Sequence, residues 1–196
     1  MPTTLLELPA KLDPPRKRWT RKDCEALSWM PDWERLELIE GELINKMGKN
    51  QPHVISLVYL LAWLQGVFGV RRVLPEAPID VAPEDNPTSK PEPDLAVLKR
   101  EVLHFRKEPP QPCDLDLVLE VADTKLYFAL TTKASLYARA GIADYWVLDI
   151  AGRRMIVHRQ PREGRYSSVV VYSNDESVAP LAAPESLLKV GDAFPE

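Results

Sequence analysis

Hydrophobic and polar positions follow the period of regular structure most clearly between residues 115 and 149. A short apolar run at 117–121 contains one carboxylate, Glu120, and a second apolar run covers 145–148. The apolar residues between these runs have helical spacing. This pattern predicts a strand, a crossover helix and a second strand, the βαβ unit of an α/β core. The carboxylate inside the first strand needs a partner, because burying an unpaired charge is costly.

The predicted helix, about 126–140, places a lysine on its apolar face. At about 100° per residue, Leu126, Leu130, Lys133 and Tyr137 fall on one side. The Lys133 ammonium must therefore reach solvent along its own stem or meet a negative partner. A helix that follows strand 117–121 packs back over Glu120. The Glu120 carboxylate and the Lys133 ammonium are therefore interpreted either as a reaction centre or as a structural ion pair. Replacing Lys133 with Met is expected to preserve most of the stability, because the stem packs similarly and the charge is expensive to bury.

The remaining pattern predicts an irregular arm at 1–18 and a single domain at 19–196. The arm holds four prolines and a basic cluster at 16–18. Thr20 is expected to cap a short helix, with Asp23 in capping-box register. The other predicted elements are a helix at 52–68, strands at 36–47, 71–81 and 95–98, a hairpin from 153–160 and 165–172, and a capping tail at 178–194.

Composition and charge narrow the class of protein without identifying it. With 196 residues, 45% of them hydrophobic, the chain is long enough for one compact core. A net charge of −4 is not typical of nucleic-acid-binding proteins, so DNA contact would require a local basic patch. Cys24 and Cys113 lack metal-ligand spacing and are expected to be reduced, which fits a cytoplasmic protein.

Several common signatures are absent from the sequence. No signal-peptide pattern and no run of about 18 uninterrupted apolar residues is present, so no contact with a membrane is expected. The GxGxxG, P-loop and GxSxG motifs and the usual zinc spacings are also missing, which excludes the commonest cofactor and hydrolase sites.

Four other polar residues occupy positions where a site could form. Asp94 follows Pro93 at the start of the apolar strand 95–98, where a turn-forming role is an equal alternative. Glu40 and Glu42 share one side of a strand by its period of two, and solvent-facing positions are the simpler interpretation. His53 opens the helix 52–68, where a local hydrogen-bonding role is the simpler interpretation.

Five motifs together resemble the Uma2 family, formerly DUF820, which is placed in the PD-(D/E)XK nuclease superfamily. They are LIEGELI at 38–44, His53 at the start of a helix, EPDLAVL at 92–98, LVLEVAD at 117–123 and KASLYARAGIADYWVLD at 133–149. The last motif is the most specific, and the resemblance covers about residues 19–159. It implies an α/β (α+β) restriction-endonuclease-like fold, a mixed β-sheet flanked by helices with Asp94 and Glu120 on adjacent strands.

The resemblance also implies a metal-dependent endonuclease that hydrolyses DNA phosphodiester bonds. Asp94 and Glu120 are the expected ligands of Mg²⁺ or Mn²⁺, with the carbonyl of Val121 as a third, because hard cations prefer oxygen. Lys133 is the expected catalytic lysine, and Glu42 is expected to complete the acidic site. His53 is a candidate substrate contact. DNA is the expected partner, and a homodimer is one alternative for the oligomeric state, which the sequence leaves open.

Two positions depart from the pattern that the resemblance implies. In the common form of the superfamily a lysine stands two residues after the glutamate, where this chain has Ala122; Uma2-like sequences carry it on the next helix, where Lys133 matches. The family usually has an aspartate four residues before that lysine, where this chain has Ala129. An acid at 129 would orient the lysine, so its absence predicts a less constrained Lys133. A second function therefore stays open, a catalytically weakened or inactive nuclease-fold module that binds or regulates.

Overall fold

The computed structural model describes residues 16–27, 29–31, 35–46 and 50–195. Most of the predicted arm, residues 1–15, lies outside this range. Residues 16–20 lead into helix α1 (Arg21–Ala26) without regular structure. The predicted capping box is confirmed, since the backbone N–H of Asp23 donates to Oγ1 of Thr20 and the backbone N–H of Thr20 donates to Oδ2 of Asp23.

A six-stranded mixed sheet forms the centre of the molecule, in the order β3-β4-β5-β6-β7-β8. The strands are β3 (Val73–Pro75), β4 (Leu95–Leu98), β5 (Leu115–Ala122), β6 (Asp144–Asp149), β7 (Arg154–Arg162) and β8 (Arg165–Ser173). Only β5 and β6 are parallel; the other neighbouring pairs are antiparallel. The predicted mixed sheet and its strand–helix–strand unit are confirmed.

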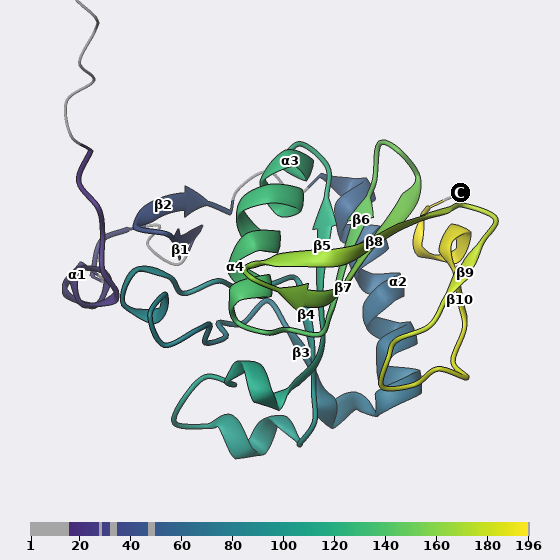
Figure 1. Ribbon diagram of the computed structural model, residues 1–196, viewed down its shortest axis with the longest axis horizontal. Helices are drawn as coiled ribbons and strands as arrows, with labels where there is room; N and C mark the ends of the chain where they lie inside the picture. The colour runs from purple at the N-terminus through teal and green to yellow at the C-terminus, as the bar shows by residue number, and fades with distance from the viewer. Residues whose placement is uncertain (1–15, 28, 32–34, 47–49, 196) are drawn as a thin grey trace, which may run out of the picture.

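Helices cover both faces of the sheet (Figure 1). Helix α2 (Gln51–Phe68) lies on one face, and the β5-to-β6 crossover lies on the other. Successive residues of β5 point to opposite faces, so Leu117 and Leu119 pack with Leu60 and Leu64 of α2, while Val118 packs on the crossover side. Glu120 has the same parity as Val118, and the alternation therefore directs its carboxylate toward the crossover helix.

The crossover is not one uniform α-helix. It consists of α3 (Leu126–Phe128), a π-helical turn η6 (Ala129–Lys133) and α4 (Ala134–Arg139). The backbone N–H of Ala134 donates to the carbonyl of Ala129, five residues earlier, as a π turn requires. The hydroxyl of Tyr145 on β6 donates to the same carbonyl at 3.0 Å. The extra residue in this turn changes the rotation between its two ends relative to an ideal α-helix.

A two-stranded hairpin, β1 (Leu36–Ile39) and β2 (Glu42–Asn45), stands beside the sheet (Figure 1). Glu40 and Gly41 both have positive φ, 49° and 78°, as a tight two-residue hairpin turn requires. The backbone N–H of Gly41 donates to the carbonyl of Thr88, and the N–H of Lys90 donates to the carbonyl of Leu38. These bonds tie the hairpin to the segment that leads into β4.

One predicted element is wrong in extent. The predicted strand at 71–81 is reduced to β3 (Val73–Pro75), because Pro75 and Pro78 cannot donate to a sheet. Among the described residues, α2 is the one helix that is long and apolar enough to cross a membrane by length and composition alone. In the structure it packs on the sheet through Leu60 and Leu64, which are fully buried.

The remaining elements are short. The tail lines the α2 side of the core through Val178, Leu188 and Phe194, in agreement with the predicted capping role. The 3₁₀ turns are η2 (Val70–Arg72), η3 (Asn86–Thr88), η4 (Val102–Phe105), η5 (Pro112–Asp114) and η7 (Val190–Ala193), and the tail pair is β9 (Ser177–Val178) and β10 (Leu188–Lys189).

Candidate active site

A cavity of about 470 Å³ opens where the hairpin, the start of α2, the end of β5 and the π turn meet. Charged side chains dominate its lining. The acids are Glu37, Glu76, Glu92, Asp94, Glu120 and Asp123, and the bases are Arg35, Lys46, Lys125 and Lys133. These groups come from several separate stretches of the chain, and the fold gathers them around one space.

Asp94 is fixed at the mouth of β4 by the neighbouring strand. Its Oδ2 accepts the backbone N–H of Val121 at 2.8 Å, and its side chain is largely buried. Nε2 of His53 lies 3.4 Å from Oδ1 of Asp94. The position that the sequence assigned to Asp94, at the entrance of an apolar strand beside Glu120, is the position that it occupies.

Glu120 receives two donors from the crossover helix, both on the same oxygen. Nζ of Lys133 lies 2.8 Å from Oε1, and the hydroxyl of Tyr137 donates to Oε1 at 3.0 Å. Among the described residues, Oε2 of Glu120 has no hydrogen-bond partner. Burial raises the pKa of Glu120 to about 7, with Asp94 and Glu37 adding to the increase and Lys133 opposing it.

Lys133 is more constrained than the sequence predicted. Its ammonium lies between Oε1 of Glu120 and Oε2 of Glu37, the latter at 3.0 Å, and the residue is 4% exposed. Burial alone would lower the pKa of Lys133, but the carboxylates of Glu120 and Glu37 outweigh it and hold the pKa above its ordinary value. The ammonium therefore stays charged, although Ala129 offers it no acid.

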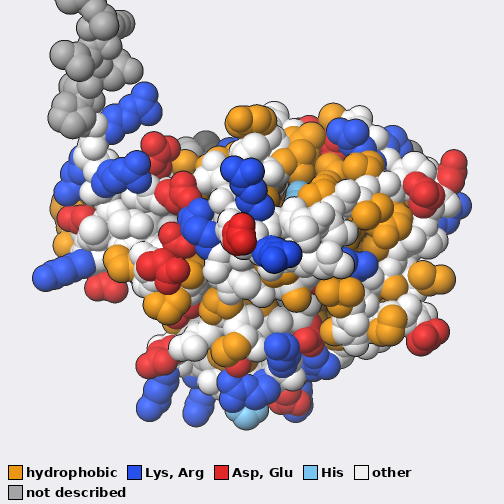
Figure 2. Space-filling view, in the orientation of Figure 1, with side chains coloured by type: hydrophobic (Ala, Val, Ile, Leu, Met, Phe, Trp, Pro, Cys, Tyr) orange, Lys and Arg blue, Asp and Glu red, His pale blue; other side chains and the backbone are white. Residues whose placement is uncertain are grey.

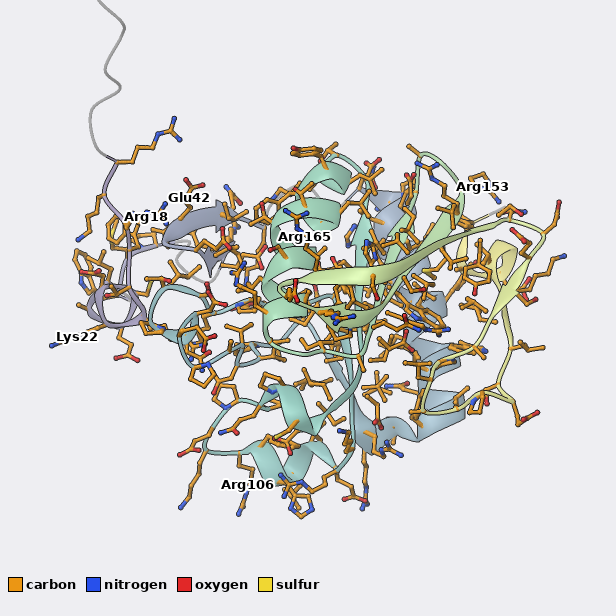
Figure 3. The ribbon with its side chains drawn as sticks, viewed as in Figure 1. Arg18, Lys22, Glu42, Arg106, Arg153 and Arg165 are labelled. Atoms are coloured by element: carbon orange, nitrogen blue, oxygen red, sulfur yellow. The ribbon has the colours of Figure 1, made fainter. Side chains whose placement is uncertain are left out.

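The sequence prediction named Glu42 for the acidic site and did not name Glu37, whereas the structure brings Glu37 and not Glu42 to the cavity. Glu42 sits next to the hairpin turn, exposed and outside the cavity, and Figure 3 shows it pointing away from the sheet. Glu37 lies farther from the turn, 5% exposed, and its Oε2 also accepts the backbone N–H of Glu92. One signal was present in the sequence: Glu37 shares its strand face with Ile39, which is buried.

Two further predicted residues line the cavity. His53 is 8% exposed and sits against Asp94, and its Nε2 makes no hydrogen bond within the described residues. Val121 contributes its N–H to Asp94. The assignments of His53 as a substrate contact and of the Val121 carbonyl as a metal ligand stay predictions.

The donor set fits a hard divalent cation. Glu37, Asp94 and Glu120 bring three carboxylates and Lys133 one ammonium into a buried space, so negative charge is in excess when all three are ionised. The described residues contain no group of three acids, histidines or cysteines arranged to hold a metal ion by themselves. Mg²⁺ does not need one, because it commonly binds through one or two carboxylates and completes its shell with water and phosphate oxygens. Glu120 and Asp94 both line the cavity, and carboxylate oxygens of this kind are the ligands that such an ion takes.

The chain is similar to known nuclease-like proteins. The model of the Uma2 family, described as "Putative restriction endonuclease", matches residues 22–190. A solved structure from Anabaena variabilis, described as a putative nuclease belonging to DUF820, superposes with a TM-score of 0.65 at 18% sequence identity. The match covers 87% of this chain and 96% of that chain, and at this identity it shows a shared fold. No curated protein matches the chain.

Proposed function

Because the chain belongs to the Uma2 family, we propose that it is a metal-dependent endonuclease that hydrolyses phosphodiester bonds of DNA. One observation carries the proposal: Asp94, Glu120 and Lys133 meet in one cavity, with the ammonium 2.8 Å from Glu120. Carboxylates that can hold a hard cation, next to a lysine that stays charged, supply the groups that phosphodiester hydrolysis needs.

Asp94 and Glu120 would hold Mg²⁺ or Mn²⁺, with the Val121 carbonyl as a further oxygen. When bound, such an ion polarises a phosphoryl oxygen and lowers the pKa of water. One oxygen of each carboxylate is held by hydrogen bonds. Oδ2 of Asp94 accepts the N–H of Val121, and Oε1 of Glu120 accepts from Lys133 and Tyr137. The cavity lining holds more acidic than basic side chains, which favours a cation.

Lys133 would act as a donor and a fixed positive charge. Its raised pKa disfavours the neutral amine that a general base requires. An ammonium has three N–H donors; one is hydrogen-bonded to Glu120, and a second lies on the side of Glu37, whose Oε2 is ion-paired at 3.0 Å. The third remains for a phosphate oxygen, where it would stabilise the charge that develops during hydrolysis.

Contact with DNA would rest on local basic residues. On the face shown in Figure 2, Lys and Arg side chains are interspersed with Asp and Glu, in keeping with the net charge of −4. Arg35, Lys46 and Lys125 line the cavity and could neutralise phosphates next to the cleaved bond. Binding by a few such contacts should weaken steeply with salt.

The second candidate, a nuclease-fold module without activity, was motivated by Ala129. The arrangement of Lys133 weakens that argument, because Glu37 supplies a carboxylate to the ammonium from the hairpin. An inactive module would still be expected to bind DNA without cutting it, so a cleavage assay separates the two functions.

The test is plasmid nicking by the wild type and Glu120→Gln with Mg²⁺, Mn²⁺ or excess EDTA. We expect metal-dependent nicking by the wild type, none in EDTA and none by Glu120→Gln. Nicking that persists in both Glu120→Gln and EDTA would reject the proposed site. DNA binding without cleavage under every metal condition would favour the inactive module.

A further inference from the structure

Tyr137 is a buried hydroxyl aimed at the candidate metal ligand. It is fully buried in the core on the α4 side of the sheet, and its ring packs edge-on against Tyr145 with 5.0 Å between centroids. Its hydroxyl donates to Oε1 of Glu120 at 3.0 Å. A phenolic hydroxyl is protonated at neutral pH, so Tyr137 is a donor in this contact.

Tyr137 and Lys133 act on Glu120 from adjacent turns of one helical segment. Lys133 ends the π turn η6, and Tyr137 follows four residues later on α4. Both donors meet at Oε1, and the described residues offer no donor to Oε2. Two donors on one oxygen fix the plane of a carboxylate more firmly than one, because a single contact leaves the group free to rotate about its last bond.

We propose that Tyr137 is a positioning residue that fixes Oε1 of Glu120 so that Oε2 is held ready for a divalent cation. The inference rests on the proposed function, because it assigns Tyr137 a role toward the metal that Glu120 would bind. The hydroxyl binds no metal and touches no substrate; it acts through Glu120. Lys133 alone cannot fill this role, since Glu37 competes for its ammonium at 3.0 Å.

A purely structural explanation also exists, because a buried tyrosine hydroxyl usually needs an acceptor. Tyr166 provides a matched control within the same chain. Its hydroxyl donates to the backbone carbonyl of Ile142 at 2.9 Å, and it does not line the cavity. Tyr137→Phe and Tyr166→Phe each remove one tyrosine hydroxyl and its hydrogen bond, but only the first touches Glu120.

The experiment is calorimetric titration of Mn²⁺ into the metal-free full chain: wild type, Tyr137→Phe, Tyr166→Phe and Glu120→Gln, with the Tm of each measured without metal. We expect Tyr137→Phe to bind Mn²⁺ about tenfold more weakly, the effect typical of removing a group that orients a ligand. Tyr166→Phe should match the wild-type affinity and lower the Tm by a similar amount. In plasmid nicking, the Mn²⁺ concentration for half-maximal rate should rise by the same factor in Tyr137→Phe.

The outcomes separate this inference from the proposed function. Wild-type affinity in Tyr137→Phe, with Glu120→Gln impaired, would overturn the positioning role and leave the metal site intact. Equal affinity in wild type and Glu120→Gln, or no Mn²⁺ binding by either, would overturn both. If Tyr137→Phe lacks native near-ultraviolet circular dichroism, Tyr137→Leu is titrated instead, because it also lacks a donor and adds no volume; an affinity equal to wild type there would likewise overturn the inference.

Discussion

Lys133 and Glu37 form a buried ion pair, with Nζ of Lys133 3.0 Å from Oε2 of Glu37. The lysine comes from the π turn that follows β5, and the acid comes from the first strand of the hairpin. Because Ala129 lacks a carboxylate, this pair gives the lysine its second negative partner. The ion pair therefore makes the hairpin part of the candidate site.

We predict that Glu37→Gln lowers metal-dependent nicking about tenfold or more, the range found when an orienting partner is removed. The variant keeps the shape of the side chain and removes its charge, so the ammonium is drawn fully to Glu120. Glu42→Gln is the matched control on the same hairpin and should cleave like the wild type, because Glu42 is exposed and outside the cavity. Equal rates for Glu37→Gln and wild type would exclude Glu37 from the mechanism.

Lys133→Met should abolish cleavage and, contrary to the expectation from the sequence, should destabilise the fold at neutral pH. The ammonium is paired with two buried carboxylates, and removing it leaves both uncompensated. Breaking a buried ion pair from one side costs about 3–5 kcal/mol. Urea unfolding should show this loss at pH 8 and a partial recovery at pH 5, where the carboxylates protonate. Cleavage that survives in Lys133→Met would remove the lysine from the mechanism.

The stability of the metal-free protein should carry a pH signature of Glu120. Its pKa rises from an ordinary value of 4.5 to about 7 in the folded state, so the native protein binds the extra proton. The contribution of Glu120 to the free energy of unfolding is fully present below pH 4.5 and is lost as the pH rises through about 7. The slope between these values is at most about 1.4 kcal/mol per pH unit.

Glu120→Gln is the control that isolates this contribution, because it removes the titrating group and keeps the shape. Denaturant unfolding in EDTA from pH 4 to pH 8 gives the free energy of unfolding of each protein. The difference in this free energy between wild type and Glu120→Gln should change over that pH interval. A difference that stays constant with pH would show that Glu120 keeps its ordinary pKa.

We predict that Ala129→Asp binds Mn²⁺ more tightly than the wild type and nicks plasmid faster. Ala129 lines the cavity, so the new carboxylate adds negative charge beside Lys133. Without metal, the added charge should lower the Tm, since the site already holds an excess of carboxylates. Saturating Mn²⁺ should restore the Tm. An unchanged Mn²⁺ affinity together with unchanged nicking would show that position 129 does not limit this site.

Much of the fold follows from local patterns in the sequence. The apolar strand around Glu120, the strand after Asp94, the Thr20 capping box and the turn at Gly164 each depend on residues within a few positions of one another. Alternation along β5 also determines that Glu120 faces the crossover helix. These features depend on backbone geometry and on the burial of adjacent residues. Both leave a short-range pattern of apolar and polar positions, from which such features can be predicted.

The tertiary structure decided which acids share the cavity and how the lysine reaches them. Glu37 and Glu42 lie on the same hairpin, and only the docking of that hairpin through Leu38 and Lys90 buries one and leaves the other exposed. The π turn ending at Lys133 could not be predicted from a constant rotation per residue, because part of its support is a hydroxyl from β6. Sequence periodicity describes each element alone, whereas burial and pairing of charges depend on contacts between elements far apart in the chain.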